Sequence, residues 1–213
     1  MGVIKICGLT TLADARWALE QGADCLGFVL YRQSPRGITV SQLREILQGL
    51  PGEVAAVAVV VNETSAFLEA LVRECRLRAV QFHGDEAAGT VAPGGVASWR
   101  AARWQGGRWM PDPAVWQAER YVMDAAAPGY GGSGMKIDWE AAGALARRYP
   151  ALLAGGLGPD NVAEAISKVR PLGVDVASGV EQAPGRKDPV KVAEFIRAAR
   201  VAFGGSEGKM VNG

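Results

Sequence analysis

The regular alternation of short apolar runs with helix-like segments is the feature that most constrains the fold of this chain. Continuous apolar runs rich in β-branched residues are typical of strands buried on both faces, as in a parallel sheet. Seven such runs occur, at residues 3–7, 25–30, 54–61, 79–82, 121–123, 151–154 and 173–177. Segments with the period of an amphipathic helix lie between them, at residues 12–20, 41–47, 65–74, 139–148, 162–168 and 189–201. This alternation predicts βαβ units.

An eighth strand would close these units into a barrel, and residues 96–102 are the candidate for it. The 213 residues divide into roughly 26 per unit, which fits a lean (β/α)₈ barrel. A doubly wound open sheet would need fewer strands, and no Gly-x-Gly-x-x-Gly follows the first one. We therefore predict an α/β protein with a single (β/α)₈ TIM-barrel domain over residues 1–203. Residues 204–213 are polar and contain glycine, so we expect a disordered tail.

Two local features refine this prediction. Capping residues precede several helical segments: Thr10 and Thr11 before the first, Ser41 at the second and Asp188 ahead of Pro189 at the last. Residues 87–113 are rich in Gly, Trp and Pro, so the helices around the fifth strand cannot be placed from the sequence.

Composition excludes several classes of function. Lys and Arg number 23 against 22 acidic residues, whereas a nucleic-acid-binding protein normally shows a basic excess. No apolar run is long enough to span a membrane, and the N-terminus lacks the features of a signal peptide. Three scattered cysteines suit neither a disulfide framework nor a metal site. We expect a cytoplasmic protein that binds no metal, nucleic acid or membrane.

In a barrel of this kind the active site lies at the C-terminal ends of the strands. Two glycine-containing segments follow the last two predicted strands: Gly155 with Gly156, and Ser178 with Gly179. Barrel enzymes often hold a phosphate between these two loops through backbone N–H groups. Either pair alone could be an ordinary turn, but their joint position predicts a phosphate site.

Cys7 ends the first predicted strand, where it is either a small buried apolar residue or a reactive group. A free thiol is mostly protonated at neutral pH, so a reactive Cys7 needs a group that lowers its pKa. Lys5 lies on the same face of its strand as Cys7, and Asp175 interrupts the apolar run of the eighth strand. The first and eighth strands of a closed barrel are neighbours. We predict that Lys5 and Asp175 pair inside the barrel beneath Cys7; the alternative is that one of them points outward.

Three further polar residues stand at strand ends or in loops of the mouth. Asp124 ends the sixth strand and could cap a turn or act as an acid that complements Cys7. His83 is the only histidine, for which a structural role is the first interpretation. Arg36 could be a solvated surface charge, or its planar guanidinium could bind a carboxylate. The glycine-rich loop 128–134 after Asp124 could fold over a ligand.

The chain resembles the phosphoribosylanthranilate isomerase family of tryptophan biosynthesis over nearly its whole length. The resemblance is carried by motifs in the family's order: Lys-Ile-Cys-Gly-Leu-Thr from Lys5, Ser-Pro-Arg ending at Arg36, Val-Gln-Phe-His-Gly through His83, Gly-Gly-Ser-Gly at 131–134, Leu-Ala-Gly-Gly-Leu at 153–157 and Val-Asp-Val-Ala-Ser-Gly-Val-Glu at 174–181. So many spaced motifs make a chance match very improbable.

This resemblance implies an Amadori rearrangement of N-(5′-phosphoribosyl)anthranilate to 1-(2-carboxyphenylamino)-1-deoxyribulose 5-phosphate. It implies that Cys7 is the general base and Asp124 the general acid. It also implies that Arg36 meets the anthranilate carboxylate and that the two glycine-containing loops hold the phosphate. The reaction involves no redox change, so no cofactor is expected.

The chain departs from the family at a few positions, and some questions stay open. Gly37 stands where relatives often have an aromatic residue, while Phe82 and Ala177 replace the more common Leu and Ser. The alternatives are another phosphosugar barrel enzyme, such as a ribulose-phosphate epimerase or indole-glycerol-phosphate synthase, and a catalytically silent barrel that binds a phosphorylated ligand. The sequence decides neither between a monomer and a homodimer nor whether the aminoimidazole ribotide of histidine synthesis is also a substrate.

Overall fold

A closed sheet of eight parallel strands forms the centre of the molecule. The computed structural model describes residues 2–125 and 137–207. The barrel strands are β1 (Val3–Ile6), β2 (Cys25–Val29), β3 (Ala56–Val60), β4 (Ala79–Phe82), β5 (Ala97–Gln105), β7 (Arg120–Ala125), β8 (Ala151–Leu153) and β9 (Gly173–Val176). They pair in the order β4-β3-β2-β1-β9-β8-β7-β5, and a parallel pairing of β4 with β5 closes the ring. The predicted barrel is confirmed.

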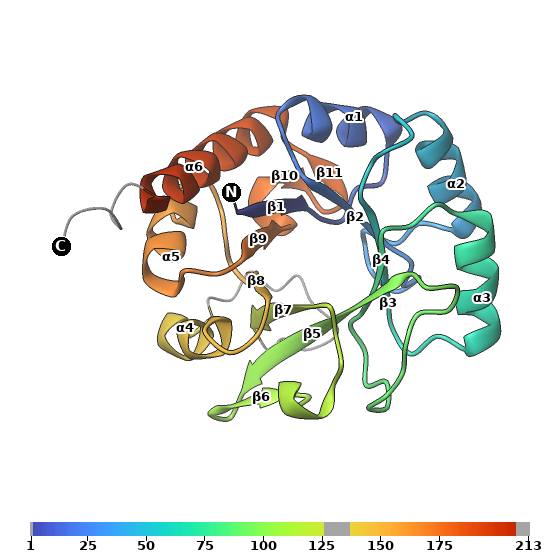
Figure 1. The fold of residues 1–213 in the computed structure, drawn as a ribbon. Helices are drawn as coiled ribbons and strands as arrows, with labels where there is room; N and C mark the ends of the chain where they lie inside the picture. The colour runs from blue at the N-terminus through green and yellow to red at the C-terminus, as the bar shows by residue number, and fades with distance from the viewer. Residues whose placement is uncertain (1, 126–136, 208–213) are drawn as a thin grey trace.

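Helices surround this barrel on the outside (Figure 1). Those in the described residues are α1 (Leu12–Glu20), α2 (Val40–Gln48), α3 (Ser65–Glu74), α4 (Trp139–Ala146), α5 (Val162–Val169) and α6 (Pro189–Glu207). Strand β3 shows why the sequence carries continuous apolar runs. Its residues are all buried: Ala58 and Val60 pack in the core shared with the helices, whereas Val57 packs inside the barrel. Because both faces of each strand are covered, little alternation of polar and apolar residues is left.

The fifth barrel strand is longer than predicted, and its surroundings differ from a regular unit. β5 continues to Gln105 and turns back as an antiparallel hairpin with β6 (Arg108–Met110), after which η1 (Pro113–Val115) forms a single 3₁₀ turn. Within residues 79–125, all of which are described, no α-helix separates β4 from β5 or β5 from β7. The guanidinium of Arg100 lies 4.5 Å from the ring of Trp116 and donates to the carbonyls of Phe82 and Gly84. These side chains help to cover β5 in place of helices.

The helix caps confirm two of the predicted positions and correct one. Thr11 caps α1 by accepting a hydrogen bond from the Asp14 amide, and Asp188 accepts from the amides at the start of α6. Ser41 was expected to cap the second helix, but this prediction is wrong. Thr39 is the cap residue, because it forms a reciprocal capping box with Gln42 that satisfies two backbone donors at once.

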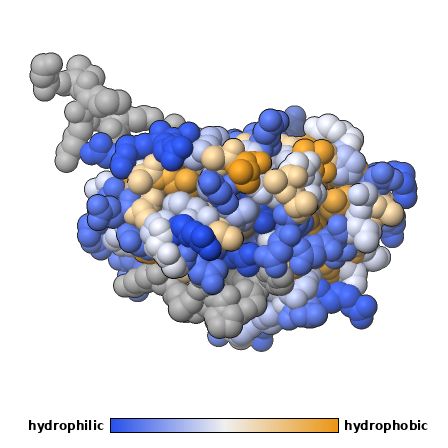
Figure 2. Space-filling model, turned by 90° about the horizontal axis from the view of Figure 1, so that it is seen from below, coloured by the Kyte–Doolittle hydropathy of each residue, from blue (hydrophilic) through white to orange (hydrophobic). Residues whose placement is uncertain are grey.

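The surface is mixed in character. The face shown in Figure 2 is largely hydrophilic with small separate apolar areas. The most exposed large apolar side chains of the described residues are Val201, Val190, Val91 and Val115. No helix in the described part of the chain is long and apolar enough to cross a membrane. Helix α6 runs past the predicted domain end at residue 203, and residues 208–213 lie outside the described residues, so disorder there stays a prediction.

Candidate active site

The C-terminal ends of the barrel strands meet at one mouth, and most of the predicted polar residues lie there. Cys7 directly follows β1, and Asp124 is the penultimate residue of β7. In the ring of strands, β9 and β8 separate β1 from β7 on one side, and β2, β3, β4 and β5 separate them on the other. Cys7 and Asp124 therefore stand on well-separated strands around a common opening.

The predicted Lys5–Asp175 pair lies inside the barrel. The two residues are register partners on β1 and β9, and Lys5 Nζ donates to Asp175 Oδ1 at 2.9 Å. The Lys5 side chain is fully buried and that of Asp175 is 8% exposed. Burial lowers the pKa of the Lys5 ammonium, but Asp175 and Cys7 raise it by more, so the pKa lies above its ordinary value. Lys5 is therefore a permanent cation beneath the mouth.

Cys7 lies above this pair, packed closely against the neighbouring strand. A Cβ atom at Gly27 of β2 would come within 2.7 Å of the Cys7 sulfur and 3.0 Å of Lys5 Nζ, so only glycine leaves room for both side chains. Burial raises the pKa of the Cys7 thiol above its usual range, while the nearby Lys5 charge lowers it in part. The predicted influence of Lys5 is present, but it does not outweigh burial in the structure.

Replacing Lys5 tests this influence directly. A Lys5→Met, Asp175→Asn double variant removes both buried charges and so avoids leaving either one unpaired, which would be strongly destabilising. Lys5 favours the thiolate more strongly than Asp175 opposes it. We therefore expect the Cys7 pKa to rise further in this variant, measured as the pH dependence of alkylation in a background that lacks Cys25 and Cys75. An unchanged titration would contradict a role for Lys5 in ionising Cys7.

Asp124 is largely buried and makes one fixed hydrogen bond. Its side chain is 14% exposed, and its Oδ1 accepts from the Ala125 amide at 2.8 Å. Burial raises the pKa of Asp124 to about 6, against the opposing effect of that amide. A carboxyl group with such a pKa is protonated in a useful fraction near neutrality, which is the property of a general acid. The loop 128–134, which was predicted to fold over a ligand, lies outside the described residues.

His83 lies beside Asp124 and is held in its neutral form. Its Nε2 is 3.7 Å from Asp124 Oδ2, and its Nδ1 is 3.3 Å from Gln81 Nε2. Burial, then the charges of Arg103, Lys5 and Arg100, lowers the pKa of His83 to about 3. An imidazole that stays neutral at pH 7 carries no imidazolium proton to donate.

The neutrality of His83 can be read directly, because it is the only histidine of the chain. We expect its ring signals in an NMR titration to stay constant down to about pH 4; a midpoint near 6.5 would contradict the burial argument. The unfolded chain takes up this proton near pH 6.5 and the folded one only near pH 3. Since the unfolded state binds more protons between these values, His83 lowers the free energy of unfolding as the pH falls through that window.

Arg36 is buried, which rules out the surface-charge interpretation. It stands in the loop between β2 and α2 and is 9% exposed. Its Nε and Nη2 donate to the two carboxylate oxygens of Glu181 at 2.8 and 2.7 Å, and Lys187 Nζ donates to Glu181 Oε1 at 3.0 Å. Glu181 and Lys187 were missed as site residues. Glu181 is the last residue of the Ser-Gly-Val-Glu motif and Lys187 follows it in the sequence, which is the one signal that could have drawn attention to them.

The two loops of the predicted phosphate site lie side by side. Gly155 and Gly156 after β8 have φ values of 73° and 66°, which glycine adopts at little cost. Ser178 opens the 3₁₀ turn η2 (Ser178–Val180) after β9. A Cβ at Gly179 would overlap the Leu157 carbonyl, so these loops touch through backbone alone.

Asn161 fixes the first of these loops. Its Oδ1 accepts from the Gly158 amide and its Nδ2 donates to the Gly156 carbonyl, both at 2.9 Å. No residue in the described part of the chain accepts a hydrogen bond from the amides of Gly155 and Gly156. The arrangement can bind an anion through backbone N–H groups.

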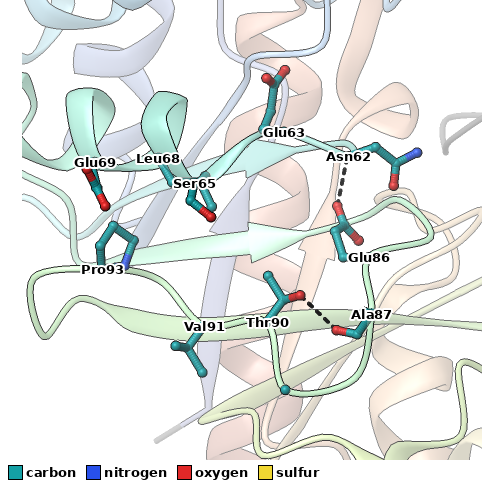
Figure 3. Close-up of a pocket in the computed structure, with 11 residues that line it drawn as sticks. Asn62, Glu63, Ser65, Leu68, Glu69, Glu86, Ala87, Thr90, Val91 and Pro93 are labelled. Atoms are coloured by element: carbon teal, nitrogen blue, oxygen red, sulfur yellow. Dashed lines mark hydrogen bonds between the residues drawn. The ribbon is translucent and has the colours of Figure 1, made fainter.

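A cavity of about 590 Å³ lies beside the mouth, between α3 and the loop after β4 (Figure 3). Three glutamates line it: Glu63, Glu69 and Glu86. Glu86 accepts hydrogen bonds from the amides of Asn62 and Gly84 and from Arg100, so both of its carboxylate oxygens have protein partners (Figure 3 shows the contact with Asn62). This acidic lining does not suit a doubly anionic phosphate. Among the described residues, no group of three His, Cys, Asp or Glu side chains could hold a metal ion.

Comparison with known proteins decides between the barrel families. The model of the N-(5′-phosphoribosyl)anthranilate (PRA) isomerase family matches residues 4–198. The chain belongs to this family. It is 46% identical over 202 residues to the PRA isomerase of Trichlorobacter lovleyi, covering 94% of this chain and 98% of that one. It is 42% identical over 198 residues to that of Geobacter sulfurreducens, covering 92% and 98%. The predicted family, and with it the isomerase activity in tryptophan biosynthesis, is confirmed.

Solved structures of PRA isomerases share this fold. That from Thermotoga maritima superposes with a TM-score of 0.82 at 35% identity, covering 94% of this chain and all of that one. A PRA isomerase in complex with reduced 1-(o-carboxyphenylamino)-1-deoxyribulose 5-phosphate superposes with a TM-score of 0.79 at 32% identity, covering 94% and 100%. A further Thermotoga maritima structure is described as a monomer generated from a dimeric enzyme.

Proposed function

We propose that this PRA isomerase works by proton transfer between Asp124 and Cys7 across the barrel mouth. The observation that carries the proposal is that two titratable groups lie at the same mouth. One is the Asp124 carboxyl, whose pKa burial raises to about 6, and the other is the Cys7 thiol, which lies above the buried Lys5. One group can donate a proton near neutrality and the other, once ionised, can accept one. The reaction needs these two functions.

The chemical steps assign each proton. Protonation of the furanose ring oxygen by Asp124 allows the C1–O bond to break as the anilino nitrogen lone pair forms a C1=N bond. The Cys7 thiolate then removes the proton from C2, and the C–H electron pair forms the enolamine. Transfer of the 2-hydroxyl proton to C1 completes the ketone. Cys7 then gives its proton to solvent and Asp124 takes one up, so both groups return to their starting forms. Protons alone are exchanged, and the product is an isomer of the substrate, so the chemistry calls for no cofactor.

The two anionic ends of the substrate give the remaining residues their roles in this proposal. The backbone at Gly155, Gly156, Ser178 and Gly179 would hold the phosphate, because the two loops present amides next to each other at the mouth. Arg36 would meet the anthranilate carboxylate, supported by its burial at the mouth near Cys7. Its hydrogen bond to Glu181 raises the pKa of the guanidinium, and the charge of an ionised Cys7 adds a smaller effect in the same direction. A cytoplasmic location and a monomeric or homodimeric state complete the proposal, with a phosphorylated small molecule as the only required partner.

The direct test is the loss of PRA fluorescence when the purified protein is added. We expect a first-order decrease whose rate is proportional to the protein concentration, with phosphate-bearing product as the only new species. Saturable binding of PRA without its conversion would instead indicate a silent phosphate-binding barrel. Adding the aminoimidazole ribotide of histidine synthesis to the same protein would show whether it is also a substrate.

A further inference from the structure

Arg36, to which the proposed function assigns the substrate carboxylate, is part of a buried three-charge cluster. Arg36, Glu181 and Lys187 lie together, with side chains 10%, 5% and 2% exposed. The proposed mechanism gives Glu181 and Lys187 no role, although burying charged groups is costly unless each is paired and hydrogen-bonded. The arrangement of their donors and acceptors shows what the cluster can do.

Glu181 occupies one edge of the Arg36 guanidinium and leaves the other edge open. Nε and Nη2 donate to the two carboxylate oxygens at 2.8 and 2.7 Å, in a bidentate pair. A guanidinium carries five N–H donors in one plane. Two of them bind Glu181, so the outer edge formed by Nη1 and the second Nη2 proton remains, and it has the geometry that fits a second carboxylate. No other described residue forms a hydrogen bond with this edge.

The charges of the cluster favour an anion at that open edge. Two cations share one anion, since Lys187 Nζ donates to Glu181 Oε1 and to the Ala177 carbonyl, each at 3.0 Å. Hydrogen bonding and charge interactions with Arg36 and Lys187 lower the pKa of Glu181 despite its burial, so the carboxylate is ionised at neutral pH. One positive charge is left over, and a substrate carboxylate would balance it.

Contacts with the neighbouring loops hold the cluster in place. The hairpin of β10 (Glu181–Ala183) and β11 (Arg186–Lys187) carries Glu181 together with Lys187, the second cation that binds it. The Thr10 hydroxyl ties this hairpin to the first loop by donating to the Gly185 carbonyl at 2.7 Å. At Gly8, whose φ is 71°, a Cβ would lie only 2.5 Å from Arg36 Cδ. The stem of Arg36 is therefore confined on one side by Gly8 and its head on the other by Glu181.

We propose that Glu181 is a positioning residue for substrate selection. It binds the Nε–Nη2 edge of Arg36, so that the opposite edge of the guanidinium faces the carboxylate of the aromatic amine. Lys187 supplies the second positive charge, which keeps the net charge of the cluster positive and so favours the binding of an anion. This inference rests on the proposed function, because it assigns the carboxylate subsite of the same reaction. In this proposal the cluster of Arg36, Glu181 and Lys187 recognises the 2-carboxyl group on the aromatic ring of the substrate.

The test compares PRA with its analogue built from aniline, which lacks the carboxylate, on wild-type protein and Glu181→Gln. The glutamine side chain of this variant turns an N–H group toward one of the cations and can hold only one nitrogen of Arg36. We expect the KM for PRA to rise about tenfold or more with kcat little changed, as for loss of a charge-assisted contact made equally in the ground and transition states. The kcat/KM for the aniline analogue should stay within about twofold of wild type.

Matched variants keep the outcome interpretable. Glu86→Gln breaks the other buried Glu–Arg pair, in which Glu86 contacts Arg100 at 2.6 Å, and is expected to leave the preference for PRA over the analogue unchanged. Should Glu181→Gln fail to fold, Glu181→Asp carries the same test, because the shorter carboxylate keeps the charge but cannot reach both nitrogens. An equal loss of kcat/KM on both substrates would overturn the proposal. Absence of wild-type turnover on both would instead reject the proposed function.

Discussion

Replacing Asp124 with Asn is expected to lower kcat by about 10²–10⁴-fold while leaving the affinity for the product nearly unchanged. Asn keeps the size of the side chain and an oxygen that can accept from the Ala125 amide, so the end of β7 should hold its position. It has no acidic proton to deliver to the ring oxygen. The measurement is the rate of PRA fluorescence loss together with the dissociation constant of the reduced product analogue.

The control for this variant is Asp112→Asn, which alters an exposed aspartate that caps the 3₁₀ turn η1, on the connection that leads into β7. Its kcat should match wild type. Near-normal turnover of Asp124→Asn would remove Asp124 from the acid role, and the neutral His83 beside it could not take that role over at pH 7.

Cys7→Ser is expected to lower kcat to a similar extent, by about 10²-fold or more. Serine fits the space bounded by Gly27 and Lys5, but its hydroxyl is far less acidic than a thiol and stays protonated even beside the Lys5 ammonium. The substrate can then bind, and its ring can open, without removal of the C2 proton. Exchange of the C2 hydrogen with solvent deuterium, followed by NMR, measures the removal of the C2 proton separately from ring opening.

Cys75→Ser serves as the matched control, since Cys75 is a buried free cysteine at the end of α3, away from the strand ends. It should retain wild-type turnover even if it lowers the melting temperature. A Cys7→Ser enzyme that still exchanges the C2 hydrogen at the wild-type rate would show that another group is the base.

The barrel could be predicted from the sequence because burial on both faces leaves an unmistakable pattern in strands such as β3. The fifth strand has the weakest signal for a physical reason. It carries Trp99 and Arg100 next to each other: the tryptophan packs inside the barrel, and the arginine covers the outer face where other strands carry apolar residues against helices. The hairpin with β6 depends on two glycines with positive φ, Gly106 and Gly107, and not on any apolar period.

The residues of the site also divide into those whose contacts the sequence pattern predicts and those whose contacts only the folded structure shows. The pairing of Lys5 with Asp175 could be proposed in advance because a closed barrel makes the first and last strands neighbours and each of these strands carries one charged residue. The register that brings the two side chains together is seen only in the structure. The contact of Glu181 with Arg36 could not be predicted, because it joins positions 145 residues apart through a hairpin that has no recognisable strand pattern in the sequence. The direction of the Cys7 pKa shift could not be predicted either, since a sequence shows a neighbouring lysine but not the degree of burial that outweighs it.

The burial of Cys7 and Asp124 gives the two groups a proton distribution opposite to the one that the proposed mechanism requires. The carboxyl group, with a pKa of about 6, loses its proton before the thiol, whose pKa burial raises. At neutral pH the dominant form carries a thiol and a carboxylate, and the competent form, with a thiolate and a carboxylic acid, is a minor tautomer of the same net charge. Changing the pH cannot alter the ratio of the two tautomers, because both carry the same number of protons. The active population is therefore set by the difference between the two proton affinities, so any ligand that desolvates Asp124 or adds charge near Cys7 adjusts the rate without touching a reacting atom.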